Sequence, residues 1–247
     1  MNTFALLGAA LIGLALGLTG AGGSIITLPV LVYLADLLPK EAVGLSLFVV
    51  GVAALVGALQ RIRSGEIHLK AGILFALSGM IGAAGGARLT PMVSGRLLMI
   101  FFAVLMLTVA LNMLTGSKVE PSTQSKCHPA RCLSVGLAVG VLTGFIGVGG
   151  GFLLMPALVK FAKLPLRVAT GTSLAVISFN SAAGFFSHYG EAPPRWSLAF
   201  VFAGIAAAGV LLGSSFAKRL PVNRLRQGFA ILVILTGSFV LWQSWMG

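Results

Sequence analysis

The chain has 247 residues, of which 57% are hydrophobic and only 9% are charged, and its mean hydropathy is +1.03. A soluble domain carries roughly 25% charged residues, so this composition excludes a water-facing globular surface and indicates an integral membrane protein with many spans. The net charge of +12 does not indicate nucleic acid as a partner. The basic residues lie in short clusters between apolar segments, where they set orientation and meet anionic lipid head groups.

Apolar runs that end at charged, proline or polar residues predict eight membrane segments. A spanning helix needs about 20 residues, and six of the segments are near that length, whereas the first and the fifth are too long for one straight crossing. No basic residue precedes the first segment, so we interpret it as part of the fold and not as a cleaved signal peptide. In chain order the segments cover residues 4–38, 42–60, 69–87, 97–115, 133–159, 168–187, 196–216 and 227–246.

The two halves of the chain resemble each other at a shift of 127 positions. The string GLTGAGGSIITLP at 17–29 matches GFIGVGGGFLLMP at 144–156, and AVGLSLFVV at 42–50 matches ATGTSLAVI at 169–177. An apolar chain yields matches of Leu and Val by chance, but glycine, proline and serine in register are harder to obtain by accident. The pattern therefore indicates an internal duplication.

The duplication predicts a repeat at 1–115, a polar linker at 116–131 and a second repeat at 132–247. If all eight segments cross, the Lys and Arg residues divide ten to seven between the two sides; if the fifth turns at its glycines and leaves by the same face, they divide thirteen to four. The positive-inside rule favours the second arrangement. Each half is then a re-entrant, broken glycine-rich helical hairpin plus three transmembrane helices, so the halves are inverted repeats. This all-α fold places the linker in the cytoplasm and both termini on the periplasmic or extracellular side.

The glycine clusters GAGGS and GVGGG predict breaks in membrane helices. Broken backbone at membrane depth leaves N–H and C=O groups without partners, at several kcal/mol each unless protein, water or a ligand supplies them. Glycine permits the sharp turns, and a helix that resumes at 22–24 or 149–151 leaves free N–H groups at its positive end, which suits a small oxyanion. The wider GxxxG pairs, Gly13 with Gly17 and Gly140 with Gly144, are interpreted as sites of close helix contact.

Polar residues inside the second and sixth segments give a second signal for a binding site. Ser46 and Ser173 correspond between the halves, so we place them beside the two hairpin tips; hydroxyls that bond back to their own helix are the alternative. Thr19 and Thr27 are further candidates. The amide of Asn180 needs partners that it cannot find within one helix. The predicted substrate-binding residues are Gly20, Gly22, Gly23, Ser24, Ser46, Gly147, Gly149, Gly150, Gly151, Thr172, Ser173 and Asn180.

The chain contains five acidic residues, and all of them fall at segment ends or in loops. No carboxylate for a cation or a proton relay is evident at membrane depth, which favours an anion. We interpret Arg61 and Arg88 as anchors that snorkel to the interface and His188 as a boundary residue. Cys127 and Cys132, with the histidine between them, are weak grounds for a metal site, and two free thiols are the simpler interpretation. No metal, cofactor or enzymatic activity is predicted.

These motifs resemble the TauE/SafE sulfite exporter family, also called the toluene-sulfonate uptake family. The resemblance is carried by GLTGAGGSIITLPVLV at 17–32, GFIGVGGGFLLMPALV at 144–159, GTSL at 171–174 and AKRLP with a following arginine at 217–224. It implies an inner-membrane carrier of bacteria and archaea, with relatives in plants, that moves sulfite, sulfonates, sulfoacetate and related organic acids. The first repeat reads GLSL where the second reads GTSL, so the first half would contribute fewer hydroxyls.

Together these features predict a multi-pass transporter of the cytoplasmic membrane that carries a small sulfur-containing oxyanion by alternating access. The alternatives are a passive small-anion channel, a carrier of other organic acids, a membrane enzyme and a scaffold subunit. The predicted partners are the anion and the lipid bilayer, without nucleic acid. Proton coupling stays open because sulfite and bisulfite interconvert near neutrality, and a homodimer is an open possibility.

Overall fold

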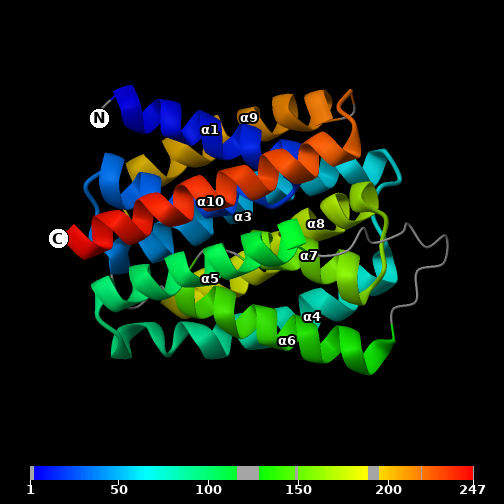
Figure 1. Cartoon of the computed structure of the whole chain (residues 1–247), viewed down its shortest axis with the longest axis horizontal. Helices are drawn as coiled ribbons and strands as arrows, with labels where there is room; N and C mark the ends of the chain where they lie inside the picture. The colour runs from blue at the N-terminus through cyan, green and yellow to red at the C-terminus, as the bar shows by residue number, and fades with distance from the viewer. Residues whose placement is uncertain (1–2, 116–127, 148–149, 189–194, 218, 247) are drawn as a thin grey trace.

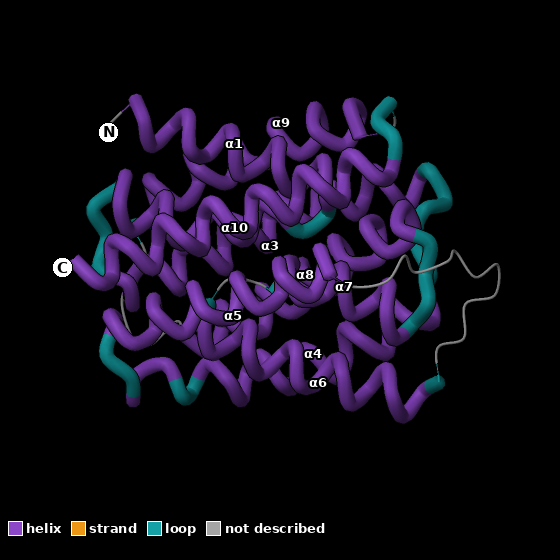
Figure 2. The backbone as a smooth tube through the Cα atoms, in the orientation of Figure 1, coloured by secondary structure: helices purple, strands orange, loops and turns teal. Residues whose placement is uncertain are grey.

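Every regular element in the described part of the chain is a helix, as predicted (Figures 1 and 2). The computed structural model describes residues 3–115, 128–147, 150–188, 195–217 and 219–246. In chain order the elements are α1 (Thr3–Thr19), α2 (Gly22–Pro29), the π-helical η1 (Val30–Leu34), α3 (Pro39–Arg63), α4 (Leu69–Ala87), the 3-10 turn η2 (Thr90–Met92), α5 (Gly95–Thr115), α6 (Pro129–Ile146), α7 (Gly151–Phe161), α8 (Leu166–His188), α9 (Trp196–Ala217) and α10 (Val222–Met246).

The surface of the bundle is suited to lipid. Four helices in the described residues are long and apolar enough to cross a membrane, namely Pro39–Arg63, Leu69–Met92, Pro129–Ile146 and Trp196–Ala217, and shorter apolar helices accompany them. Many large apolar side chains point outward, with Ile81 70% and Phe186 75% exposed. Exposed apolar surface on this scale is unfavourable in water, so the protein is a multi-pass membrane protein.

The first and fifth predicted segments are both broken where the glycines lie. We expected the helix to resume at 22–24 and at 149–151, and α2 begins at Gly22 and α7 at Gly151. In the first hairpin the return leg runs antiparallel to α1, because Gly8 of α1 packs against Val30 while Gly23 packs against Ile12. A single unbroken rod is therefore excluded for the first segment.

The two halves pack on each other reciprocally. Helix α1 of the first half lies along α9 of the second half, and α6 of the second half lies along α4 of the first half. In the same reciprocal way, α3 packs on α9 and α8 packs on α4. Helix α3 also packs on α8, and α5 packs on α10. Glycines make these approaches close. Gly13 and Gly17 lie against the backbone of α9, and Gly140 and Gly144 lie against that of α4, which confirms the interpretation of both GxxxG pairs as helix contacts.

The marked chain ends and the α3–α4 connection lie at opposite ends of the bundle (Figure 1). We call the end that carries the connections 64–68 and 162–165 the basic end, and the other the terminal end. The basic residues of the described chain are unequally divided between them. Among the basic residues whose side chains the structure describes, those at the basic end are Arg61, Arg63, Lys70, Arg131, Lys160, Lys163, Arg167 and Arg219, and those at the terminal end are Lys40, Arg88, Arg96 and Arg195.

Thiol labelling in intact cells tests whether the halves are inverted. In a variant whose two cysteines are replaced by serine, Phe4→Cys and Leu38→Cys should react from one face of the membrane, because the first hairpin enters and leaves at the terminal end. His128→Cys and Pro165→Cys should react only from the opposite face. Reaction of Phe4→Cys and Leu38→Cys from opposite faces would show that the first segment crosses, and inversion would be rejected.

Candidate functional site

At the tip of the first hairpin, backbone N–H groups of α2 lie where the helix itself offers them no acceptor. Gly20 adopts the left-handed conformation, with φ at 71°, which glycine takes without strain. The hydroxyl oxygen of Thr19 accepts from the N–H groups of Gly22 at 2.6 Å and Ala21 at 3.3 Å. Gly23 and Ser24 also lie in the first turn of α2, where backbone N–H groups have no acceptor within their own helix. The first turn of α2 is thus only partly capped.

The tip of the second hairpin has the same character. Gly147 and Gly150 are both left-handed, with φ at 75° and 76°. The carbonyl of Gly150 accepts from the N–H groups of Leu153 and Leu154. Gly151 and Phe152 are the first residues of α7, so their N–H groups likewise have no acceptor within their own helix. The predicted site residue Gly149 lies outside the described residues.

The two helix starts meet at the centre of the molecule. A Cβ added to Gly151 would lie 2.8 Å from the hydroxyl oxygen of Ser24, 2.9 Å from Cδ1 of Ile177 and 3.1 Å from the carbonyl oxygen of Ala21. Only a glycine at 151 therefore allows α7 to begin directly against the start of α2. Both helices direct their positive ends and free N–H groups into this region, which is the arrangement that binds anions.

Ser46 and Ser173 each hold the tip that belongs to the other half. The hydroxyl of Ser173 donates to the carbonyl of Gly20 at 2.9 Å, and that of Ser46 donates to the carbonyl of Gly147. Each is also within bonding distance of a carbonyl of its own helix, as the alternative reading expected. In this arrangement both serines position the tips, and direct contact with a ligand remains a prediction that requires the hydroxyls to turn.

The other predicted polar residues have different settings. Thr172 accepts from the N–H of His68 at 3.0 Å and so faces the start of α4. Thr27 donates to the carbonyl of Gly23 within its own helix. Asn180 is 1% exposed, and neither its amide nitrogen nor its amide oxygen has a partner among the described residues. Because an unpaired buried polar group costs about 1–3 kcal/mol, Asn180 is the predicted residue best placed to need a ligand.

Two contacts that the sequence did not reveal fix the hairpins at opposite ends. At the basic end, Nη2 of Arg61 donates to the carbonyl of Gly17 at 3.2 Å. At the terminal end, Thr90 donates to the carbonyl of Phe145 at 2.8 Å, and Nε2 of His188 lies 3.2 Å from the Thr90 hydroxyl. Arg61 and His188 correspond at the shift of 127 positions. The two contacts are therefore counterparts with different chemistry, and His188 is buried at the end of α8.

Two further expectations are wrong. Arg61 does not snorkel, because its side chain is 5% exposed and forms an ion pair with Glu66 at 2.7 Å; Arg88 is exposed, as an anchor should be. Cys132 is not a free thiol but is disulfide-bonded, while Cys127 lies outside the described residues. Across the described ranges no three His, Cys, Asp or Glu side chains gather into a metal site.

The comparisons with known proteins agree with the membrane architecture. The model of a family described as Sulfite exporter TauE/SafE matches residues 5–240. A probable membrane transporter protein of Xylella fastidiosa is 33% identical over 244 residues, covering 95% of this chain and 93% of that protein. Probable membrane transporter proteins of Bacillus subtilis (YunE) and Haemophilus influenzae are 25% and 28% identical, with 92% and 93% of this chain covered and 92% and 94% of theirs. No solved structure matches the chain.

Removing the hydroxyl of Ser173 should loosen the first hairpin. Ser173→Ala leaves the carbonyl of Gly20 unpaired at membrane depth, so we expect a loss of about 1–3 kcal/mol, seen as a lower Tm in detergent. Ser178→Ala on the same helix is the control, because its hydroxyl bonds only to the carbonyl of Ala175. Equal Tm values for the two variants would show that the Ser173 contact does not hold the tip.

Asn180 gives the opposite expectation for stability. Its amide has no protein partner to lose, so Asn180→Leu should leave the Tm unchanged or raised, whereas Asn180→Asp should abolish anion binding by placing a negative charge in the site. Both are measured by thermal unfolding with and without 10 mM sulfite, an amount on the order of a weak site's Kd. A lowered Tm in Asn180→Leu together with an unchanged sulfite effect would assign Asn180 a structural role instead.

Proposed function

The chain belongs to the TauE/SafE sulfite exporter family of membrane transporters, and on that premise we propose that it carries a small sulfur-containing oxyanion, such as sulfite, a sulfonate or sulfoacetate, across the cytoplasmic membrane. The meeting of two half-helix starts is the observation that carries the proposal. Each brings the N–H groups of its first turn and a positive end to one buried region, and an anion of two or three oxygens matches such donors.

The charges around the site support an anion over a cation. The described acidic residues Asp36, Glu41 and Glu66 lie outside the region where α2 and α7 begin, so no carboxylate in the described chain opposes the positive helix ends. Gly22, Gly23, Gly150 and Gly151 keep side chains away from the donors, and Asn180 supplies an amide that an oxyanion satisfies through its N–H₂ group. Thr172 and Ser173 belong to the same helix as Asn180 and complete the proposed shell.

We further propose that transport proceeds by alternating access between inverted repeats. The reciprocal packing of the halves supports this, since the contact of α1 with α9 has its counterpart in that of α6 with α4, and the contact of α2 with α3 in that of α7 with α8. The first tip would be free to move toward the basic end if Arg61 released the carbonyl of Gly17 and Ser173 released that of Gly20. The second tip would be free to move toward the terminal end if Thr90 released the carbonyl of Phe145 and Ser46 released that of Gly147. Freeing one tip at a time exposes the site to one face at a time.

The positive-inside rule assigns the basic end to the cytoplasm, and with it both chain ends to the periplasmic or extracellular side. The described residues alone place eight basic side chains at the basic end and four at the other. We also propose that transport is coupled to protons and that the protein forms a homodimer. Both properties have to be measured on the purified transporter.

Counterflow into proteoliposomes tests the proposal. Vesicles preloaded with unlabelled sulfite should take up labelled sulfite faster than empty vesicles, because a carrier exchanges while a passive channel does not. A panel of thiosulfate, sulfoacetate, taurine and sulfate as competitors then defines the substrate. Absence of exchange for every anion in the panel would reject the proposed substrate class, and uptake without acceleration would favour the channel.

Gly151→Val is the matching variant. The new side chain meets two movable groups, the Ser24 hydroxyl and the end of Ile177, and also the backbone carbonyl of Ala21. We expect the helix starts to be forced apart and exchange to fall at least about tenfold, a change of 1.4 kcal/mol or more. Gly204→Val is the control, because nothing lies within 4 Å of a Cβ there. If Gly151→Val elutes as an aggregate, Gly151→Ala replaces it. Normal exchange in a folded variant would count against the site.

A further inference from the structure

A buried histidine takes part in the contact that holds the second hairpin at the terminal end. Nδ1 of His188 lies 2.9 Å from the carbonyl oxygen of Gly184, and Nε2 lies 3.2 Å from the hydroxyl oxygen of Thr90. That hydroxyl lies 2.8 Å from the carbonyl oxygen of Phe145, two residues before Gly147 in the tip. The side chains of His188 and Thr90 are both buried. A continuous row of hydrogen bonds therefore runs from the end of α8 through η2 to the second tip.

This row of three bonds needs more hydrogens than a neutral histidine supplies. A carbonyl oxygen only accepts, so Nδ1 must donate to Gly184, and the hydroxyl of Thr90 must donate to Phe145. The Thr90 oxygen then has only lone pairs left for Nε2, so Nε2 must donate as well. A ring that donates from both nitrogens is a protonated histidine. All three bonds form together only when His188 carries the extra proton.

Loss of the extra proton leaves Nε2 and the Phe145 carbonyl competing for the one hydroxyl hydrogen of Thr90. If the hydroxyl turns to Nε2, the carbonyl loses its donor; if it stays, two lone pairs face each other. The other neutral form of the ring, with its hydrogen on Nε2, directs the lone pair of Nδ1 at the Gly184 carbonyl instead. Each neutral arrangement loses one buried hydrogen bond, so protonation strengthens the hold on the second tip.

The charged groups around His188 do not duplicate this behaviour. The two groups that bond to the ring, a carbonyl and a hydroxyl, do not titrate near neutrality. Lysine and arginine keep their charge there, and the carboxylate of Glu41 lies 4.0 Å from Arg195 and is 39% exposed. Histidine ordinarily exchanges a proton between about pH 5 and 8. The other described charged residues at the terminal ends of the surrounding elements are the exposed Lys40, Arg88 and Arg96, and Glu191 lies outside the described residues.

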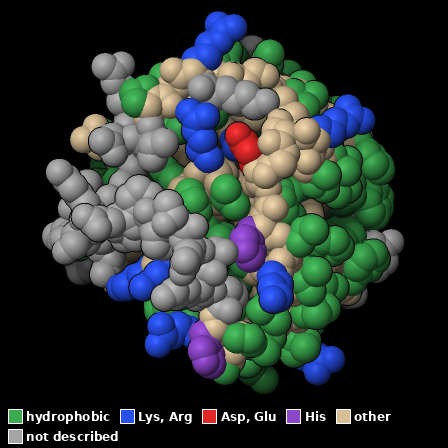
Figure 3. Space-filling view, turned by 90° about the vertical axis from the view of Figure 1, so that its right-hand side faces the viewer, with side chains coloured by type: hydrophobic (Ala, Val, Ile, Leu, Met, Phe, Trp, Pro, Cys, Tyr) green, Lys and Arg blue, Asp and Glu red, His purple; other side chains and the backbone are tan. Residues whose placement is uncertain are grey.

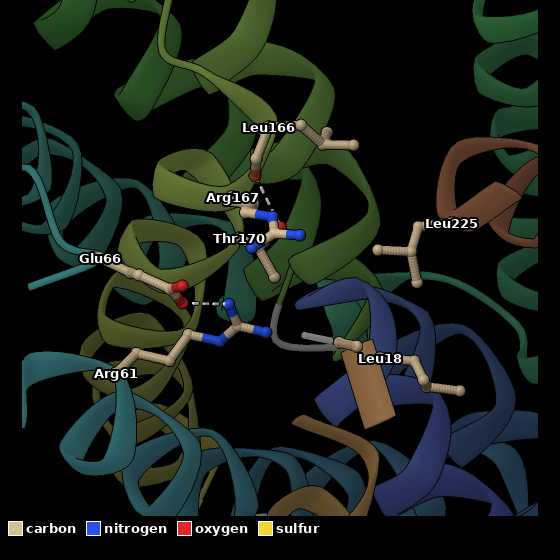
Figure 4. Close-up of a pocket in the computed structure, with 8 residues that line it drawn as sticks. Leu18, Arg61, Glu66, Leu166, Arg167, Thr170 and Leu225 are labelled. Carbon is tan, nitrogen blue, oxygen red and sulfur yellow. Dashed lines mark hydrogen bonds and ion pairs between the residues drawn. The ribbon is translucent and has the colours of Figure 1, made fainter. Parts of the chain in front are cut away.

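The matching contact at the basic end has a fixed charge. Figure 3 views that end, where Lys and Arg side chains appear at several places and acidic side chains at one. The first tip is held there by Arg61, which Figure 4 shows bonded to the carboxylate of Glu66. Arginine does not lose its proton in proteins. Because Arg61 and His188 correspond between the halves, one tip is held by a permanent charge and the other by a charge that a proton supplies.

We propose that His188 is a proton-binding site of the transporter and that a proton bound there holds the second tip closed at the terminal end. The proton binds the closed arrangement more tightly than the open one, and by linkage it favours the closed one. A lower pH at the terminal end therefore shifts the carrier toward the state that opens at the basic end. The inference rests on the proposed transport function for this role, but the proton site itself can be tested without transport.

A thiol placed under the second tip tests the proton site. Val43 is buried, and a Cβ added to Gly147 would overlap its side chain, so Val43→Cys should react only when the tip moves away. The full-length protein, with both native cysteines replaced by serine, is treated in detergent with a charged thiol reagent. Each rate is divided by the rate in the same protein carrying His188→Gln, which cancels the ionisation of the thiol itself. Between about pH 6 and about pH 8, this ratio should rise at least about fivefold, the factor for one lost hydrogen bond.

Two further variants separate the proton site from a merely structural role. His128→Gln replaces an exposed histidine at the basic end and should leave the rise intact. Thr90→Val should abolish it, because the ring loses its link to the carbonyl of Phe145. A ratio that does not change with pH, a rise that persists in Thr90→Val, or a thiol that stays unreactive at the higher pH would overturn the proposal. If His188→Gln does not fold, Thr90→Val serves as the reference, and equal pH dependence with Thr90 and with valine there is the contrary result.

Uptake of a sulfonate tests the role in transport. Methanesulfonate keeps its charge near neutrality, whereas sulfite does not. Acidification of the terminal side from about pH 8 to about pH 6 should slow uptake from that side several-fold in the wild-type protein, and not in His188→Gln. Equal slowing in both proteins, or faster uptake in the wild type, would overturn the role. Failure of the wild-type protein to exchange any anion would instead reject the transport proposal and leave the thiol result to decide the proton site.

Discussion

The rest of the structure depends on one constraint, which is that a polypeptide break inside a membrane must find partners for its own N–H and C=O groups. At the two tips, the C=O groups and the N–H groups meet this requirement to different extents. Their carbonyls are bound by Ser173, Ser46, Arg61 and Thr90, whereas the first-turn N–H groups of α2 and α7 have no acceptors within their own helices. The backbone groups that still need partners are therefore mainly donors. This surplus of donors, with no carboxylate near it among the described residues, is the physical basis of the proposed anion site.

Each tip is bound by a serine from the other half of the chain, and this makes the two tips interdependent. Ser173 of α8 binds the first tip, and Ser46 of α3 binds the second, while α3 and α8 also pack on each other. A movement of α3 relative to α8 changes both serine contacts together. Packed interfaces favour discrete arrangements over continuous deformation, so a bundle of this kind has the mechanical basis for two states.

Much of the fold could be predicted because it depends on residues whose physical roles are narrow. Clustered glycines inside apolar segments located both breaks to within a residue or two, and the spacing of Ser46 and Ser173 placed them at the tips. The remaining contacts depend on tertiary structure. Arg61 reads as an interfacial anchor until the fold brings the carbonyl of Gly17, 44 positions away, within reach. Thr90 gave no signal because its acceptor, the carbonyl of Phe145, belongs to the other half. Helix packing decides which hydroxyl groups form hydrogen bonds to other helices, and a local sequence pattern does not predict these bonds.

The duplication has kept the geometry of the two tip contacts but not their chemistry. Arg61 with Glu66 holds one end through an ion pair, and His188 with Thr90 holds the other through a hydrogen bond between an imidazole and a hydroxyl. A buried ion pair loses its Coulombic gain when it opens but recovers hydration, so the free energies of opening at the two ends are set by different terms. For the proposed alternating-access carrier, this difference predicts unequal populations of the two states, and it predicts that ionic strength changes opening at the basic end more than at the terminal end. The bias would set which face the empty site prefers, while the gradients across the membrane would set the net direction of flux.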